Sequence, residues 1–563
     1  MRHPQFARWA LIPVLVVTFA VSTATAGPLP RDAKSLLPAD PAAVLVVASV
    51  NEMIDQVVTV TGVFEEGDGL EREKILDDIL KGFGGYAALL DLDRPVIAAF
   101  GLPDMMGGGD PPVTLIMPLH SGSSVPDTLH LEDFDVAAMA RRGDYLALST
   151  YPQFVPADAV PDLAGHLPDG LVALSLDLEQ VVLNFRPFIE MGLMGIPTRP
   201  ADTPPDSTGA FSLEEARVIG DVVRDLMDAA TRLDLAAGME GDKLTWAVGL
   251  GVKPGSVLDP GPQPDFDRAL ALTSALPADA DIVQVLAFDQ TRMFDAFGDY
   301  YRITMRQSMA ALEPEVGERY SAWVESYLQS MDLWAVPMAA ALRVRDDHMA
   351  VTAISELADA TDALNRLSGL LDGLNAVGVG FSLTPGDGVT VAGVDFRTWT
   401  IDFDLAQFQA ILEADGAMET PGPANIPVEQ MVGLLRKIMP KLYLGVCKGH
   451  MLIASDENTE DLAHMVETVK AGQLHVTIGQ VAAAAHAGKG CRQTINGDLM
   501  SIVSWMTEMV NEMDPQQKLA LAENPIPFQS DFAFEASNFH FWFGIDLEAA
   551  AQLSRAMEAM EQD

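Results

Sequence analysis

The sequence predicts an α+β protein with curved, mainly antiparallel sheets packed with long helices, arranged as two related halves. Three observations support this class. Apolar residues switch repeatedly between a spacing of two, typical of strands, and a spacing of about 3.6, typical of helices. Short Gly or Asp turns join many of the predicted strands, which favours antiparallel hairpins over a βαβ alternation. Short motifs also recur in both halves of the chain.

Residues 1–26 have the pattern of a cleaved secretory signal peptide. Arg2 and Arg8 give a positive start, residues 9–22 form an apolar core, and Ala24-Thr25-Ala26 is an A-x-A cleavage signal. The alternative is an uncleaved N-terminal anchor, because residues 9–26 could nearly span a bilayer. The small residues at 22–26 favour cleavage, and no later stretch has 18 uninterrupted apolar residues. We therefore expect a periplasmic or extracellular protein with no membrane span after signal cleavage.

The first half contains predicted strands and one clear helix. The helix begins at Leu213, where Ser212 and Glu215 form a capping box, and apolar residues continue at helical spacing to Leu233. The period-two pattern predicts strands over 42–50, 95–101, 113–118, 145–149, 171–177 and 244–250.

The second half repeats the same kinds of element. Arg345-Asp346-Asp347 reads as a tight hairpin turn between two of the strands. Strands are predicted over 282–287, 338–344, 348–354, 376–382, 388–395, 398–404, 442–447, 450–455, 531–536 and 538–545. Helices are predicted over 291–331, 357–373, 426–438, 458–470, 496–513 and 547–561.

The best domain boundary is the Pro- and Gly-rich stretch 253–265, because the sequence after it resembles a fresh start. It divides the mature chain into an N-terminal α+β domain, 34–262, and a C-terminal α+β domain, 263–563. Leu-Pro-Ala-Asp precedes a strand at 37–40 and again at 276–279, and 167–170 is a weaker third copy. Gly-x-x-Leu-x-x-Ser occurs at 143–149 and at 449–455. Duplication is the simplest explanation, and coincidence between short motifs is the alternative.

With these motifs the chain resembles a family of large exported bacterial proteins that is grouped as a domain of unknown function. The residues behind the resemblance are the exported start, the Leu-Pro-Ala-Asp motifs, the Gly-x-x-Leu-x-x-Ser strands and the acidic helix that begins near Glu457. That family has no assigned activity, so the resemblance implies export and duplication and carries over no functional residue.

The acidic composition excludes one class of partner. The chain has 80 acidic and 35 basic residues, a formal charge of −45. Without the two signal-peptide arginines the charge of the mature protein is about −47. Nucleic acid is therefore an improbable partner, and divalent cations are expected only as weak counterions on a generally solvated acidic surface.

The two cysteines are the first candidates for a specific site. In an exported protein, Cys447 and Cys491 can form a disulfide, and the alternative is two separate buried thiols. A second hypothesis adds His450 and His486, which would complete a two-sulfur, two-imidazole set suited to tetrahedral zinc. We favour the disulfide, because the spacing of these four residues is unlike that of common zinc motifs. No cofactor is predicted.

The standard catalytic motifs are missing. The sequence has no Gly-x-Ser-x-Gly elbow, no phosphate-binding loop, no dinucleotide fingerprint and no H-E-x-x-H zinc helix. The alternating aromatic residues of 531–545 are expected to pack in a core, with a ligand pocket as the alternative.

From these absences and the export signal we predict a non-catalytic binding or interaction protein of the cell envelope or extracellular space. Its partner would be another protein or an apolar ligand. The alternatives are an envelope hydrolase, with metal held by the four Cys and His residues, and a structural envelope protein.

Overall fold

The computed structural model confirms a mixed α+β protein whose sheet strands pair antiparallel. It describes residues 29–64, 70–103, 110–126, 129, 131, 134–152, 156, 170–199, 211–289, 291–308, 314–345, 348–377, 381–404, 437, 441–455, 459–475, 490–505, 525–535, 537–552 and 554. Contacts divide the described residues into two compact units. Unit 1 is drawn from Met1–Glu190, Ala230–Lys253 and Ala536–Ser554, and unit 2 from Met191–Ala229, Pro254–Glu535 and Arg555–Asp563. The change of unit at 253/254 lies near the predicted boundary, but Ala536–Ser554 belongs with unit 1, not with the C-terminal part of the chain.

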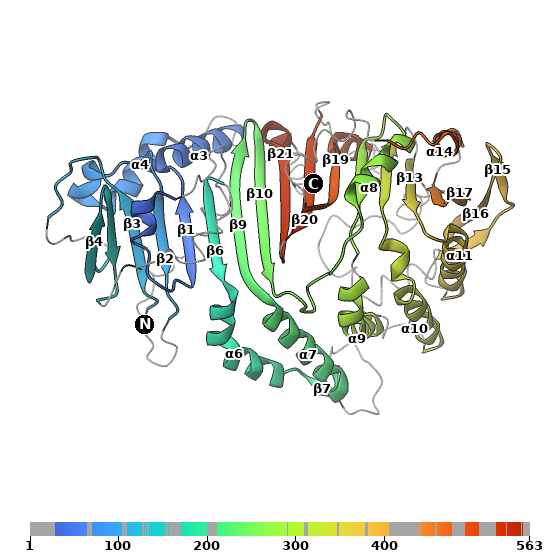
Figure 1. The fold of residues 1–563 in the computed structure, drawn as a ribbon, viewed down its shortest axis with the longest axis horizontal. Helices are drawn as coiled ribbons and strands as arrows, with labels where there is room; N and C mark the ends of the chain where they lie inside the picture. The colour runs from blue at the N-terminus through green and yellow to red at the C-terminus, as the bar shows by residue number, and fades with distance from the viewer. Residues whose placement is uncertain are drawn as a thin grey trace, which may run out of the picture. The chain divides into compact units, whose positions relative to one another are not determined.

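Unit 1 contains a sheet with the strand order β4-β5-β3-β2-β1-β6-β9-β10-β21, each pair antiparallel. In Figure 1 the red β21 lies beside the green β10, although the two strands are far apart in sequence. The strands are β1 (Ala43–Val47), β2 (Val96–Phe100), β3 (Val113–Pro118), β4 (Ala138–Arg142), β5 (Tyr145–Ser149), β6 (Val172–Asp177), β9 (Ala230–Glu240), β10 (Lys243–Val252) and β21 (Asn538–Asp546).

The helical segments α2 (Arg31–Lys34), α3 (Val50–Phe64), α4 (Arg72–Lys81) and η1 (Gly84–Leu89) accompany this sheet. On one face, Leu36 and Leu37 of the first Leu-Pro-Ala-Asp segment pack with Val44 and Val46 in a buried cluster. On the other face, η1 covers β3 and β5, and Met53 of α3 packs near the junction of β1 and β6. The helix α6 (Leu178–Met194) follows β6 directly.

Unit 2 contains a second antiparallel series, β20-β19-β11-β12-β13-β18-β17-β16, in which β14 and β15 both pair with β16. The strands are β11 (Ile282–Leu286), β12 (Met338–Val344), β13 (Met349–Glu356), β14 (Phe381–Pro385), β15 (Val389–Val391), β16 (Val394–Phe403), β17 (Lys441–Cys447), β18 (His450–Ala454), β19 (Cys491–Asp498) and β20 (Pro527–Glu535).

Helices of unit 2 form a core on each face of this series. The cores use α8 (Phe266–Leu272) and α14 (Glu460–Ala471) on one face and α11 (Ala360–Val377) on the other. The remaining elements are α7 (Leu213–Ala229), α9 (Thr291–Ser308), α10 (Pro314–Leu328), η2 (Thr273–Ala275), η3 (Met331–Trp334) and the short parallel pair β7 (Thr198–Arg199) and β8 (Phe211–Ser212).

Local sequence signals succeed where they specify hydrogen bonds. The capping box is confirmed, because Ser212 N donates to Glu215 Oε2 at 2.7 Å and Glu215 N donates to Ser212 Oγ at 3.2 Å. The predicted antiparallel pairing of 338–344 with 348–354 is confirmed by the Val344–Met349 pair and by the bond from Arg345 N to His348 O, while Asp346 and Asp347 of the predicted turn lie outside the described residues.

Other expectations were wrong. The helix from Leu213 ends at Ala229, and β9 begins at the next residue, because Leu233 and Leu235 also fit a period of two. Residues 376–377 end α11 instead of starting a strand. The helical prediction over 291–331 is confirmed in α9 and α10. Strands β4 and β19 were not predicted. Within the described residues no helix is long and apolar enough to span a membrane. Most of the predicted helix over 426–438, and all of the signal peptide, lie outside the described residues.

Candidate functional site

Strands β6, β9, β10 and β21 of unit 1 form the candidate site, because their two faces have opposite chemistry. Successive residues of a strand point to opposite faces, and the register therefore fixes which side chains share a face. Ser175, Asp234, Gly249 and His540 lie in one row across the four strands. The neighbouring row, on the opposite face, consists of Leu174, Leu235, Val248 and Phe541.

The first face carries a hydrogen-bonded polar cluster of Ser175, Arg232, Asp234 and Asn538. Ser175 Oγ donates to Asp234 Oδ1 at 2.6 Å, and Arg232 Nε donates to Asp234 Oδ2 at 2.7 Å. Ser175 is fully buried and Asp234 is 3% exposed. Both carboxylate oxygens accept a bond, as a buried carboxylate requires. Because Ser175 donates to a carboxylate and not to a histidine, this is not the serine–histidine arrangement of a hydrolase.

Two glycines of β10 allow this cluster to form. A Cβ atom on Gly249 would lie 3.3 Å from Asp234 Oδ2, and one on Gly251 would lie 2.6 Å from Thr231 Oγ1. The missing side chains leave room for residues of β9 and β21 to lean over β10. Arg232 Nη2 thus donates to Asn538 Oδ1 at 3.2 Å, although β10 lies between their strands. Close approach of side chains therefore explains glycine at both positions.

The opposite side is the apolar sheet face, which we define as Leu233, Leu235, Trp246, Val248, Leu250, Phe539, Phe541 and Phe543. Three of its central residues are strongly exposed: Trp246 at 36%, Val248 at 38% and Phe541 at 41%. Val248 and Phe541 are directly paired, and the rings of Trp246 and Phe543 lie 5.4 Å apart. The expectation that Phe539, Phe541 and Phe543 belong to a core was wrong, because none of the three is buried.

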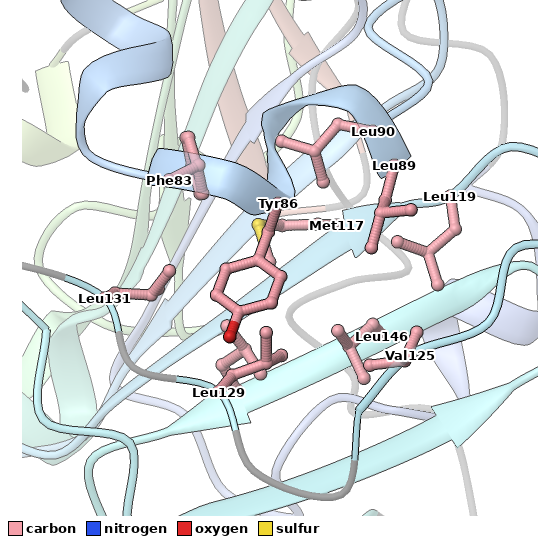
Figure 2. Close-up of a pocket in the computed structure, with 11 residues that line it drawn as sticks. Phe83, Tyr86, Leu89, Leu90, Met117, Leu119, Val125, Leu129, Leu131 and Leu146 are labelled. Carbon is pink, nitrogen blue, oxygen red and sulfur yellow. The ribbon is translucent and has the colours of Figure 1, made fainter.

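Elsewhere in unit 1 the same side of the sheet is covered. Over β3 and β5 the covering residues enclose a small apolar pocket, and Figure 2 shows the Tyr86 ring reaching from η1 across it towards Leu129. Its lining is Phe83, Tyr86, Leu89, Leu90, Met117, Leu119, Val125, Leu129, Leu131, Leu146 and Leu148. A catalytic pocket needs several converging polar groups, and this lining supplies only one phenol.

The two cysteines of the predicted site lie apart, whereas Cys447 and His450 are paired across β17 and β18. Cys447 lies on β17 and Cys491 on β19, with β18, β13, β12 and β11 between them in the sheet. Neighbouring strands are about 4.8 Å apart, whereas a disulfide requires Cα atoms within about 7 Å. Both thiols are free and buried in the structure.

The zinc hypothesis also lacks support from the donors that the structure describes. His450 Nδ1 lies 3.2 Å from the carbonyl oxygen of Lys448, and His486 lies outside the described residues. Burial, reinforced by the negative charge of Asp531, raises the pKa of the Cys491 thiol from 9.0 to about 12. No group of three or more metal-binding side chains occurs among the described residues.

Sequence reasoning missed the polar cluster. The available signal was a polar residue between leucines in a period-two strand, Leu174-Ser175-Leu176 in β6 and Leu233-Asp234-Leu235 in β9. Such a pattern marks a strand with one apolar and one polar face. Comparison with family models, curated proteins and solved structures gave no match for this chain.

Proposed function

We propose that the chain is an exported, non-catalytic binding protein of the cell envelope or extracellular space, which holds an apolar ligand or an apolar segment of a partner protein on the apolar sheet face. The observation that carries the proposal is the group of Trp246, Val248 and Phe541, exposed side by side on paired strands. Large apolar residues that adjoin one another at a surface mark interaction sites more often than scattered ones do.

The available energy suits reversible binding. The exposed parts of Trp246, Val248 and Phe541 amount to roughly 200 Å² of apolar area, worth about 5 kcal/mol before the costs of association. On the opposite face, the bond from Ser175 of β6 to Asp234 of β9 and the bond from Arg232 of β9 to Asn538 of β21 tie the strands of the sheet together, which favours a surface that is formed before a ligand arrives.

The neutral fluorescent probe N-phenyl-1-naphthylamine tests the proposal, since an anionic dye would be repelled by the acidic chain. We expect the probe to bind the wild-type protein, and Phe541→Glu to weaken binding about tenfold, because burying the ring contributes roughly 1.5 kcal/mol. Leu70→Glu is the matched control, because Leu70 is 45% exposed and does not belong to the face. Equal probe affinity in wild type and Phe541→Glu would refute the proposal.

We further propose that the two predicted halves arose by duplication. Strand order supports this. Seven neighbouring strands of unit 1 lie in the order β9-β6-β1-β2-β3-β5-β4, and seven of unit 2 in the order β20-β19-β11-β12-β13-β18-β17. When the strands of each set are numbered by their position in the sequence, the two spatial orders are the same. A seven-strand order of this irregularity is improbable by chance.

Individual hydrogen bonds give the same correspondence. Val113 N donates to Thr150 Oγ1 at 3.0 Å, and Val351 N donates to Ser455 Oγ at 3.1 Å. The Leu-Pro-Ala-Asp motifs also correspond, because Leu37 N bonds Lys34 O and Leu276 N bonds Thr273 O before equivalent strands.

The Gly-x-x-Leu-x-x-Ser motifs are offset by one residue. The hairpin pairs Arg142–Tyr145 and Cys447–His450 align Gly143 with Lys448, not with Gly449. Both aligned residues have positive φ, 52° and 47°. That motif is therefore no evidence for the duplication, which rests on the topology and on the hydrogen bonds.

A further inference from the structure

Strand β4 forms an edge of the sheet of unit 1. It pairs with β5 on one side, and on its other side it pairs with no strand among the described residues. Figure 1 shows β4, in teal, at one end of this sheet. An edge strand carries backbone N–H and C=O groups that can pair with an added strand. We call this open side of the strand the β4 edge.

The register shows which backbone groups point towards the β4 edge. A two-residue turn joins β4 to β5, and Arg142 and Tyr145 flank the turn as a pair. The pair that flanks such a turn is hydrogen-bonded, and hydrogen-bonded pairs then alternate along the two strands. Arg142 and Ala140 therefore bond β5, whereas Met139 and Arg141 direct their backbone groups to the open side.

The equivalent edge of unit 2 already holds an added strand. In the two strand orders given above, β4 corresponds to β17, which pairs with β18 on one side and with β16 on the other. The hairpin pairs align Arg142 with Cys447, so Leu444 is the counterpart of Met139. Leu444 pairs with Arg397 of β16. The chain itself therefore shows that a strand in this position can accept an antiparallel neighbour through these backbone groups.

Two arginines give the β4 edge a local positive charge in a chain whose formal charge is −45. Arg141 and Arg142 are both exposed, and neither forms an ion pair with a carboxylate among the described residues. The Arg141 guanidinium instead donates to the carbonyl oxygens of Gly143 at 3.1 Å and Ser123 at 2.9 Å. These neutral acceptors hold the side chain in place and leave its charge uncompensated, which favours an acidic partner.

We infer that the β4 edge binds an extended segment of a partner protein, which runs antiparallel to β4 and has acidic residues at its N-terminal end. The N-terminal end of such a segment lies beside the C-terminal end of β4, where the two arginines are. A second copy of β4 fits less well. Antiparallel pairing of two β4 strands about Ala140 would place Arg141 opposite Met139, and β4 has no carboxylate to offer. The inference is independent of the apolar sheet face, so either can fail without the other.

The peptide Asp-Asp-Val-Thr-Val-Thr-Val, labelled with rhodamine at its C-terminus, tests the inference by fluorescence anisotropy. At about 0.15 M salt, which screens the general repulsion between two acidic molecules, the wild-type protein should bind the peptide saturably. Arg141→Glu/Arg142→Glu should weaken binding roughly tenfold, because two attractive cross-strand pairs become repulsive. Arg217→Glu is the matched control, since this side chain is 82% exposed and belongs to unit 2. Phe541→Glu should also leave peptide binding unchanged, which separates the β4 edge from the apolar sheet face.

Two N-methylated forms of the peptide test the backbone pairing. With the two aspartates opposite Arg142 and Arg141, the second and fourth residues of the peptide donate their N–H groups to β4, and the third and fifth point away. Methylation of the second and fourth nitrogens should therefore abolish binding. Methylation of the third and fifth should leave most of the affinity.

Absence of binding to the wild-type protein, equal affinity for the charge-reversed variant, or equal affinity for the two methylated peptides would each overturn the inference. Arg141 and Arg142 would then only protect the edge strand from pairing. A wild-type chain that dimerises in sedimentation equilibrium, and becomes monomeric in Arg141→Glu/Arg142→Glu, would overturn it too, since the β4 edge would then pair with a second copy.

Discussion

The buried thiol of Cys491 should make the protein sensitive to alkali. Cys491 is 2% exposed, and its Sγ donates to Gln493 O at 3.4 Å. Burial, together with the charge of Asp531, raises its pKa from 9.0 to about 12. Above pH 9 the unfolded chain therefore releases this proton while the folded chain retains it. Stability is consequently unaffected below pH 9 and falls as the pH rises towards 12.

The magnitude follows from the size of the pKa change. One pKa unit corresponds to about 1.4 kcal/mol, so the whole interval from 9 to 12 is worth about 4 kcal/mol. At about pH 10.5 half of that interval has been crossed, and the free energy of unfolding should have fallen by about 2 kcal/mol on account of this thiol.

Urea unfolding of wild type and Cys491→Ala at a series of pH values isolates the effect. Tyrosine and lysine residues also titrate in this range, but they do so in both proteins. The difference in unfolding free energy between the two proteins should be constant from pH 7 to 8.5 and should then shift by about 2 kcal/mol against wild type by about pH 10.5. Reaction of the native thiol with a disulfide reagent should be slow at pH 8.

A difference that stays constant up to about pH 10.5 would refute the reasoning, because it would mean that Cys491 titrates alike in the folded and unfolded chain. Rapid labelling of Cys491 in the native protein would refute it independently.

Four further outcomes are expected. Denatured, unreduced protein should show two free thiols; none would mean that Cys447 and Cys491 are bonded after all. Gly445→Ala should lower the free energy of unfolding by about 1–3 kcal/mol, because the new Cβ would lie 2.5 Å from the buried ring of Phe396. Gly369→Ala is the control and should stabilise α11 slightly, because nothing lies within 4 Å of its new Cβ. Equal shifts of the melting temperature in the two variants would contradict this. Asp234→Ala should cost about 3–5 kcal/mol by leaving Arg232 without its carboxylate, and the double variant Asp234→Ala/Arg232→Met should recover part of that loss in chemical denaturation. The hydrogen bond from Arg366 lowers the pKa of Asp332, so this pair stabilises the protein above pH 4 and loses its effect as the pH falls through the lowered pKa; Arg366→Gln should therefore reduce stability at pH 7, by at most about 1 kcal/mol for so exposed a pair, and the reduction should become smaller as the pH falls below 4.

Much of the fold could be predicted because its strands alternate apolar residues with polar ones or form short apolar runs. The strands β3 and β12 have the predicted bounds, and β5 likewise runs from Tyr145 to Ser149. Among the strands that were missed, β4 and β19 lack this signal. In β19, Thr494 and Asn496 point to the same face as Gln529 and Asp531 of β20, so polar side chains occupy positions where a strand normally has apolar ones. A pattern based on hydrophobicity cannot detect such a strand.

The candidate site depended on registers that are not written in the sequence. Ser175 and Asp234 are 59 positions apart, and Arg232 and Asn538 are 306 apart. The contact between Arg232 and Asn538 needs β21 to pair with β10, and no local rule predicts a strand partner at that sequence separation. The cysteines show the converse. Only 44 positions separate Cys447 from Cys491, and their compatible chemistry suggested a bond, yet the sheet places four strands between them.

The proposed duplication makes Asp40 and Asp279 equivalent positions with different partners. Asp40 and Asp279 end the two Leu-Pro-Ala-Asp motifs, and both anchor the segment before the first strand through a side-chain bond. Asp40 accepts from Gln180 of α6, whereas Asp279 accepts from Arg343 of β12 at 2.7 Å. The two acids thus make the same kind of bond, with partners from different elements. In unit 1 this bond ties the first turn of α6 to the segment before β1.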